Sequence, residues 1–211
     1  MAQRIIIADD HPLFRTALGH AVGRVWPEAE IVETSSAKGA REAVEAGAEA
    51  LLLDLHMEDS NGLSALMDFR QDFPALPVVI VSASEETRVY AAASQLGAAA
   101  FIPKSASLET MREALARVRE GENWFPETGS GPDEDLAKIA SLTPAQRRIL
   151  GQLSEGLLNK QIAYELDISE ATVKAHITAI FRKLGVVNRT QAVLLAGKLD
   201  VDQALADPAA G

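Results

Sequence analysis

Four continuous apolar runs in the first half of the chain each end in a polar side chain. The runs are residues 5–8, 50–53, 78–81 and 99–103. The polar residues that follow them are Asp9 with Asp10, Asp54, Ser82 and Lys104. Uninterrupted apolar runs are typical of strands that are buried on both faces of a parallel sheet.

Stretches with helical periodicity lie between these runs. They predict helices over residues 12–25, 36–46, 62–72, 86–96 and 107–120. In the last of them, Leu108, Met111, Leu115 and Val118 recur at helical spacing. Five strand–helix units joined by right-handed crossovers predict an α/β doubly wound sheet of five parallel strands with helices on both faces.

The pattern changes after residue 120. Residues 121–141 are rich in Gly, Pro and acidic side chains, which indicates a linker. We therefore divide the chain into a first domain (1–123), a linker (124–141), a second domain (142–199) and a tail (200–211). Trp124 and Phe125 are expected to pack back on the first domain; binding a partner is the less favoured alternative.

The second domain is purely helical in pattern. Thr143 and Pro144 begin its first helix as cap and first-turn proline, and three further helices are predicted over 159–166, 169–184 and 188–196. An all-α unit of four helices with short connections is the expected fold.

Charge is distributed unevenly. The chain has a net charge of −10, yet residues 141–199 carry eight basic and four acidic side chains. This segregation predicts a nucleic-acid-binding part on an acidic carrier. The chain has no cysteine, which fits a reducing cytoplasm. With neither a signal peptide nor an apolar segment of membrane-spanning length in evidence, we expect a cytoplasmic protein without a membrane partner.

The polar strand ends carry the candidate chemistry. Parallel strands deliver their carboxyl ends to one crevice, so Asp9, Asp10, Asp54, Ser82 and Lys104 should meet there. Carboxylates suit Mg²⁺, and one of them can accept a phosphoryl group while a lysine and a hydroxyl bind the phosphate. Asp9 can bind the metal directly or through water. Helix capping by Asp9 or Asp10 is the structural alternative; agreement of four strand ends favours a site.

Residues 1–123 resemble the receiver domain of two-component response regulators. The motifs are Ile-Ile-Ile-Ala-Asp-Asp-His at 5–11, Leu-Leu-Leu-Asp-Leu-His-Met at 51–57 followed by Gly62, Val-Val-Ile-Val-Ser-Ala at 78–83 and Gly-Ala-Ala-Ala-Phe-Ile-Pro-Lys at 97–104. The resemblance implies that Asp54 is the phosphoacceptor and that Lys104 completes the site. It implies Mg²⁺ ligands in Asp9, Asp10, Asp54 and the main-chain carbonyl of His56.

The same resemblance implies two switch residues, the hydroxyl of Ser82 and the ring of Phe101. For Phe101 the alternative is an ordinary core aromatic, and its spacing to Lys104 favours the switch. Glu58 departs from the family pattern, which commonly has proline there, so the loop after Asp54 is expected to be more mobile.

The helix predicted over 169–184 has two contrasting faces. Val173, Ile177, Ile180 and Leu184 form an apolar stripe. The opposite face carries Lys174, Thr178 and Arg182, interspersed with Ala171 and Ala175. Together with the helix over 159–166 and a turn at Asp167 and Ile168, this is a helix-turn-helix pattern whose second helix suits a DNA major groove. A solvated surface helix is the alternative.

Residues 142–199 resemble the LuxR-type helix-turn-helix domain. The resemblance is carried by Leu142-Thr143-Pro144, Gly156, Asn159 to Ala163, Leu166, Ile168-Ser169, Thr172 to His176, Lys183 to Val186 and Asn188-Arg189. It implies that Lys174, Ala175 and Thr178 face bases. Phosphate contacts are implied for Thr172, His176, Lys183 and Arg189, and backbone positioning for Asn159 and Lys160. The last helix is implied to support dimerisation.

A receiver followed by this domain is the arrangement of the NarL/FixJ subfamily. The resemblance implies a transcription regulator phosphorylated by a sensor histidine kinase, which then dimerises on a two-fold site in double-stranded DNA. It implies no enzyme activity beyond the receiver's own phosphorylation and dephosphorylation. Two alternatives remain open: a regulator that works without phosphorylation, and a Mg²⁺-dependent phosphatase with an aspartyl-phosphate intermediate.

Overall fold

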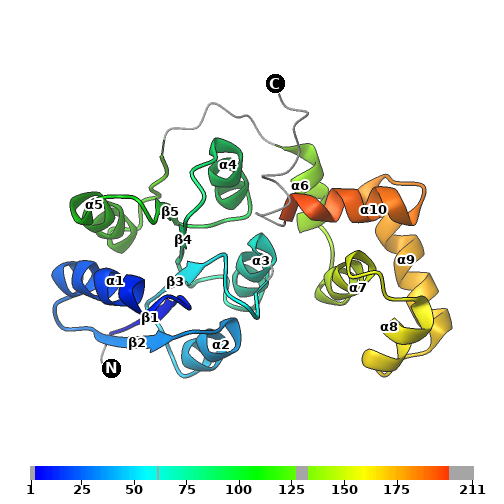
Figure 1. Cartoon of the computed structure of the whole chain (residues 1–211), viewed down its shortest axis with the longest axis horizontal. Coiled ribbons are helices and arrows are strands. Elements are labelled where there is room, and N and C mark those ends of the chain that lie inside the picture. Colours follow the sequence, from blue (N-terminus) through cyan, green and yellow to red (C-terminus); the bar gives the residue numbers. More distant parts are fainter. Residues whose placement is uncertain (1–2, 61, 127–132, 200–211) are drawn as a thin grey trace. The chain divides into compact units, whose positions relative to one another are not determined.

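The computed structural model describes residues 3–60, 62–126 and 133–199. The chain forms two compact units that divide between residues 132 and 133 (Figure 1). The expected tail, 200–211, and residues 127–132 of the expected linker lie outside the described residues.

The first unit is built on a parallel sheet in the order β2-β1-β3-β4-β5. The strands are β1 (Arg4–Ala8), β2 (Glu30–Thr34), β3 (Ala50–Asp54), β4 (Val78–Ser82) and β5 (Ala100–Pro103). The connecting helices are α1 (Pro12–Val25), α2 (Ala37–Glu45), α3 (Leu63–Asp72), α4 (Thr87–Gln95) and α5 (Leu108–Arg119). The predicted five-stranded doubly wound fold is confirmed.

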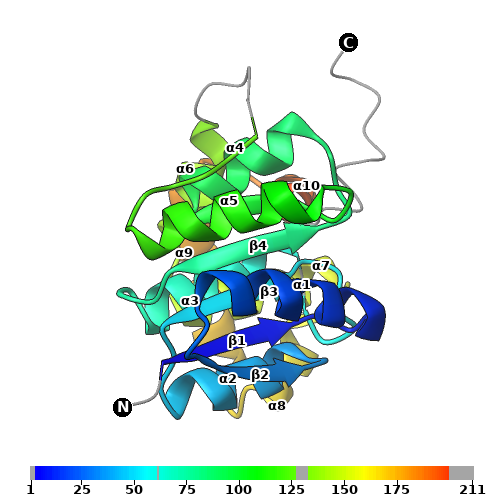
Figure 2. The ribbon, with the colours of Figure 1, turned by 90° about the vertical axis from the view of Figure 1, so that its left-hand side faces the viewer.

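Two helical layers enclose the sheet. Helices α1 and α5 cover one face, and α2, α3 and α4 cover the other (Figures 1 and 2). Alternate strand residues such as Ile5, Ile7 and Leu52 join the core under α1 and α5, because successive side chains of a strand point to opposite faces. The central strands β3 and β4 are buried along their whole length, which is why their sequences are continuously apolar.

The two edges of the sheet, at β2 and at β5, are built differently. The second strand, β2, reads Glu-Ile-Val-Glu-Thr and lies at an edge, so it carries no continuous apolar run. At the other edge Trp124 bridges Ala100 of β5 and packs against the core. The expectation that Trp124 packs on the first domain is thus confirmed.

The second unit is all helical. It contains α6 (Glu134–Ala140), α7 (Pro144–Ser154), α8 (Asn159–Glu165), α9 (Glu170–Leu184), α10 (Arg189–Ala196) and the short η1 (Gly197–Leu199). Four of these are the predicted helices. Helix α7 begins with a capping box in which Thr143 and Gln146 satisfy each other's main-chain N–H groups.

Helix α6 departs from the expected linker. Asp133 caps it, and Leu136 and Ile139 on its inner face are buried in the second unit. Lys198 of η1 binds Asp133 and Asp135 at 3.0 and 2.8 Å. Two apolar residues three positions apart in a short acidic segment are enough to fold it here, because tertiary packing stabilises helices too short to persist alone.

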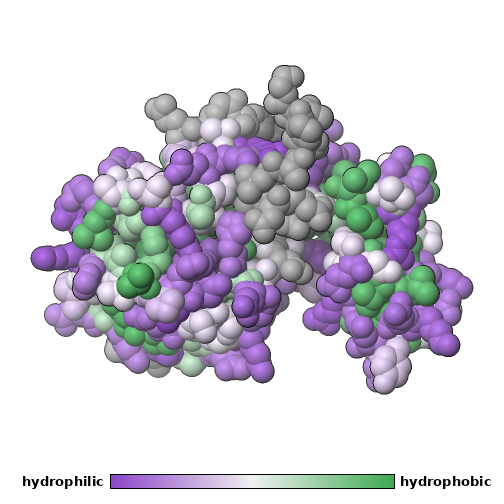
Figure 3. All heavy atoms as spheres, in the orientation of Figure 1, coloured by the Kyte–Doolittle hydropathy of each residue, from purple (hydrophilic) through white to green (hydrophobic). Residues whose placement is uncertain are grey.

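In the described part of the chain, no helix combines the length and apolarity needed to cross a membrane. On the face shown in Figure 3, hydrophobic residues gather in patches separated by hydrophilic ones. Among residues 3–60, 62–126 and 133–199, the exposed large hydrophobic side chains are Leu13, Leu108, Leu158, Tyr164, Val187 and Leu194.

Candidate functional site

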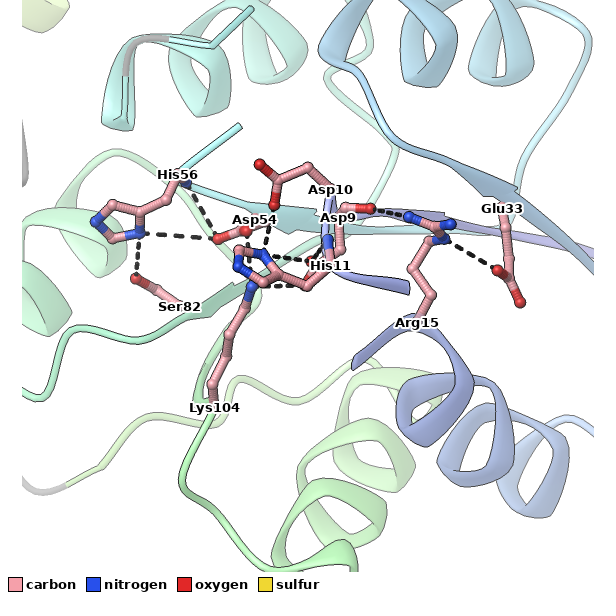
Figure 4. A network of polar contacts seen from close by, with 9 residues as sticks. All are labelled: Asp9, Asp10, His11, Arg15, Glu33, Asp54, His56, Ser82 and Lys104. Carbon is pink, nitrogen blue, oxygen red and sulfur yellow. Dashed lines mark hydrogen bonds and ion pairs between the residues drawn. The ribbon is translucent and has the colours of Figure 1, made fainter. Parts of the chain in front are cut away.

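Four strand ends bring their polar side chains together in the first unit (Figure 4). Asp9 follows β1, Asp54 and Ser82 end β3 and β4, and Lys104 follows β5. Asp9, Asp54 and Ser82 are fully buried. The carboxyl edge of the sheet therefore brings together Asp9, Asp54, Ser82 and Lys104, as their positions after the apolar runs predict.

Lys104 joins two of the buried carboxylates. Its Nζ lies 2.7 Å from Asp54 Oδ2 and 2.8 Å from Asp9 Oδ2. Burial acts to lower the pKa of Lys104, but the attraction of Asp54 and then of Asp9 outweighs it, so the pKa is raised. Lys104 is therefore an ammonium that offsets part of the negative charge. The ring of Phe14, which sequence reasoning did not single out, lies 5.0 Å from this Nζ.

The pairing of β4 with β5 positions Lys104. Lys104 N–H donates to the carbonyl of Ser82 at 2.7 Å, which continues the pairing of β4 with β5. Arg15 of α1 secures the other side by donating to the carbonyl of Asp9 at 2.6 Å and to Glu33 of β2 at 3.1 Å. A main-chain bond thus fixes Lys104, and the side chain of Arg15 fixes the main chain at Asp9.

The acidic residues have the donor set for a divalent cation. Asp9, Asp10, His11 and Asp54 each offer one ligand atom, and these atoms lie within 4.8 Å of one another. Asp9 Oδ2 and Asp10 Oδ1 are buried without a hydrogen bond of good geometry to any described residue; their close contacts are the ion pairs with Lys104 and with His11 Nδ1 at 2.5 Å. Carboxylate oxygens clustered so closely fit a hard cation such as Mg²⁺.

The capping alternative holds only in part. Asp9 Oδ1 accepts from His11 N–H at 2.8 Å, but α1 is capped by His11 and has no side-chain cap bond. Asp9 thus uses one oxygen locally and directs the other at Lys104. His11 is an addition that sequence reasoning missed, although it directly follows the acidic pair.

His56 contributes its ring as well as its main chain. Its N–H donates to Asp54 Oδ1 at 3.1 Å. Its Nδ1 lies 3.8 Å from that oxygen and 3.4 Å from Ser82 Oγ. Ser82 Oγ also accepts from Ser84 N–H at 3.2 Å. The sequence predicts a role for the carbonyl of His56 alone. The position of His56 two residues after Asp54 is the signal in the sequence that points to its ring.

Phe101 lies inside the first unit. Its side chain is fully buried, and its ring centroid is 4.6 Å from that of Tyr90 on α4. Burial, and secondarily the charge of Glu85, raises the pKa of the Tyr90 hydroxyl. This inward position is the one expected of a core aromatic, and it also links β5 to the surface helix α4.

Helix α9 presents the predicted two faces. Val173, Ile180 and Leu184 are buried and Ile177 is half-buried, whereas Thr172, Lys174, Ala175, Thr178 and Arg182 are exposed and His176 is half-buried. Ser169 caps the helix by accepting from Thr172 N–H at 3.0 Å. Asp167 in the turn before it has a φ of 52°, a left-handed conformation that aspartate tolerates better than most residues.

Two predicted phosphate-binding cations are held within the second unit. Lys183 Nζ donates to the carbonyl of Ser141 at 2.8 Å and to Gln146 Oε1 at 2.9 Å. Arg189 Nη2 donates to the carbonyls of Leu153 and Leu157 at 2.9 and 2.8 Å. Both side chains therefore bind protein oxygens in this structure.

The start of α8 carries the two residues expected to position the DNA backbone. Asn159 is half-buried and Lys160 is exposed. Among the described residues no ion pair engages Lys160, Arg148 or Arg182, so these cations are available on the surface.

Comparison with known proteins gives two family matches. Residues 5–116 match the response regulator receiver domain, and residues 140–196 match the bacterial regulatory proteins of the luxR family. A "Glycerol metabolism activator" from Pseudomonas putida is 39% identical over 93% of this chain and 96% of its own length. The "Nitrate/nitrite response regulator protein NarP" of Escherichia coli is 32% identical over 91% and 93%.

Solved structures share the fold. A structure of two RcsB dimers bound to two parallel DNAs superposes with a TM-score of 0.56 at 23% identity, covering 94% of this chain and 99% of that one. A structure of the isolated receiver domain of RcsB from Salmonella enterica serovar Typhimurium, with a phosphomimetic, covers 60% of this chain with a TM-score of 0.55 at 20% identity.

Proposed function

The chain belongs to the response regulators that join a receiver domain to a luxR-family regulatory domain, and on that premise we propose that phosphorylation of Asp54 controls its binding to DNA. The proposal rests chiefly on the fully buried carboxylate of Asp54, which lies beside Asp9 and 2.7 Å from the ammonium of Lys104. A carboxylate so placed is an acceptor for a phosphoryl group.

Asp9, Asp10 and Asp54 would hold Mg²⁺, together with the main-chain carbonyl of His56. When bound, the cation neutralises carboxylate and phosphoryl oxygens and orients the donor. An oxygen of Asp54 then forms a bond to phosphorus while the bond between phosphorus and the donor's leaving group breaks. For a sensor histidine kinase, that leaving group is the imidazole nitrogen of its phosphohistidine.

The residues around Asp54 then respond to the phosphate. Lys104 exchanges part of its contact with Asp54 for a phosphate oxygen, and the Ser82 hydroxyl donates to another. Phe101 already lies inward against Tyr90, so the phosphate would stabilise this existing arrangement of β5 and α4 rather than create it. Receiver chemistry in this account is confined to the chain's own phosphorylation and dephosphorylation.

The second unit supplies the output. We assign base contacts to Lys174, Ala175 and Thr178 on α9, and phosphate contacts or positioning to Thr172, His176, Arg182, Asn159 and Lys160. Phosphorylation would promote a homodimer that binds a two-fold site in cytoplasmic double-stranded DNA. The luxR-family match and the DNA-bound RcsB dimers of similar fold support this output.

Mass measurement of the full chain after incubation with acetyl phosphate and Mg²⁺ tests the acceptor. The wild type should gain one phosphoryl group, Asp54→Asn should gain none, and Asp68→Asn on α3, outside the site, should behave as wild type. Phosphate appearing on Asp54→Asn under these conditions would refute the assignment.

A further inference from the structure

One exposed row of side chains on α9 combines a carboxylate, an ammonium and a hydroxyl group. Glu170, Lys174 and Thr178 follow one another at intervals of four residues, so they share one side of the helix. Glu170 Oε1 lies 3.1 Å from Lys174 Nζ. Thr178 Oγ1 donates to the carbonyl of Lys174 at 3.0 Å. The row belongs to the solvent side of the helix, since all three residues are exposed while Val173 and Ile180 are buried.

Glu170 makes its charged contact within its own helix, as Asp135 also does with Lys138 on α6. The cations Arg147, Lys183, Arg189 and Lys198 bind carbonyls or carboxylates that hold the helices together. Glu170 instead pairs with an exposed lysine one turn along the same helix. The side chains remain 49% and 64% exposed, and exposed pairs of this spacing contribute little to stability. The pair therefore adds little to the stability of the fold.

The row lies where a helix-turn-helix domain meets DNA. The first turns of the second helix enter the major groove and contact base edges. Ser169 caps α9, so Glu170 is its first residue and Lys174 is one turn further in. The neighbouring exposed side chains, Ala171 and Ala175, are small and allow close approach.

We propose that Glu170 is a specificity-determining residue that reads one G·C base pair in each half-site together with Lys174. This inference rests on the proposed DNA-binding function and deepens it. Lys174 donates to the adjacent acceptors O6 and N7 of guanine, and the Glu170 carboxylate accepts from the N4 amino group of the paired cytosine. In an A·T pair, the N6 amino group of adenine stands in the place of guanine O6, and thymine O4 stands in the place of the cytosine amino group. Lys174 would then face a hydrogen-bond donor and Glu170 an acceptor.

Glu170 also weakens binding to unrelated sequences. Its charge repels phosphates, and by pairing with Lys174 it reduces what that cation adds to non-specific attraction. Glu170 thus raises discrimination in two ways, through a base contact on the correct site and through repulsion elsewhere.

Selection from a random duplex pool tests this, using full-length chain treated with acetyl phosphate and Mg²⁺. Glu170→Gln should lose preference for one G·C pair per half-site roughly ten-fold, the scale of one good base contact. Its affinity for unrelated DNA should rise. Lys174→Gln should relax the same base pair, and the double variant should relax it no further than the stronger single variant.

Glu155→Gln is the matched control, because Glu155 is an exposed acid at the end of α7 and its loss changes the net charge equally. It should select the wild-type sequence. An unchanged base preference in Glu170→Gln, or relaxation at a position different from that of Lys174→Gln, would overturn the inference. A wild-type chain that selects no sequence at all would instead overturn the proposed function.

Discussion

Replacing Arg189 tests whether its side chain stabilises the second unit or binds DNA phosphates. Its guanidinium donates to the carbonyls of Leu153 and Leu157, at the end of α7 and just beyond it. A hydrogen bond from a charged donor contributes about 1.5–3 kcal/mol. With two such bonds on a half-buried side chain, and allowing for solvent screening, we expect Arg189→Met to lower the stability of this unit by about 2–3 kcal/mol.

Hydrogen exchange of the full chain, followed by mass spectrometry, measures this loss locally. Peptides from α7 and α10 should exchange faster in Arg189→Met, because exchange reports the free energy of local opening. The salt dependence of DNA binding should keep its slope, since one lost phosphate contact would change the slope by about 0.9 per protomer.

Lys160→Met is the matched comparison. Lys160 is exposed at the start of α8, and no ion pair engages it among the residues that the structure describes. Its loss should leave exchange unchanged and make the salt slope shallower by about 0.9 per protomer. The reasoning fails if Arg189→Met instead shows the shallower slope with wild-type exchange rates.

The remaining predictions concern Lys104 and Asp167. Lys104→Met leaves the buried carboxylates of Asp9 and Asp54 uncompensated, so thermal unfolding should show the receiver less stable by about 3–5 kcal/mol, with recovery on adding Mg²⁺; no response to Mg²⁺ would contradict the charge argument. Because the folded-state pKa of Lys104 lies above 10.5, its contribution is full below pH 10.5 and is lost as the pH rises through the folded-state pKa. A pH series should therefore show that loss in wild type and not in Lys104→Met. Asp167→Val should cost about 1–2 kcal/mol at the left-handed φ of 52°, whereas Asp167→Gly should be tolerated; equal melting temperatures would refute the strain argument.

Much of the fold could be predicted because buried parallel strands have continuous apolar sequences. The hydrophobic pattern does not reveal elements whose side chains are only partly buried. Strand β2 is at a sheet edge and carries Glu30 and Glu33, so its sequence contains no long apolar run. The sequence of helix α6 reads as a linker because Leu136 and Ile139 are its only two buried residues and acidic residues surround them.

The site divides in the same way. Strand ends position Asp9, Asp54, Ser82 and Lys104, so topology alone predicts their meeting. The main-chain N–H groups of His11 and His56 donate to Asp9 and Asp54. These local bonds accompany the entry of both rings into the site, and the hydrophobic pattern does not specify them. For Lys183 and Arg189 the sequence supplies the charge but not its partner, and the structure places each on protein oxygens.

The most direct test of the central claim compares DNA affinity before and after phosphorylation. The full chain would be titrated on its selected DNA site with Mg²⁺ present, with and without acetyl phosphate, alongside Asp54→Asn. We predict tighter binding by the treated wild type and no change in Asp54→Asn. Equal affinity of treated and untreated wild type, with phosphate verified on Asp54, would contradict control of DNA binding by this residue.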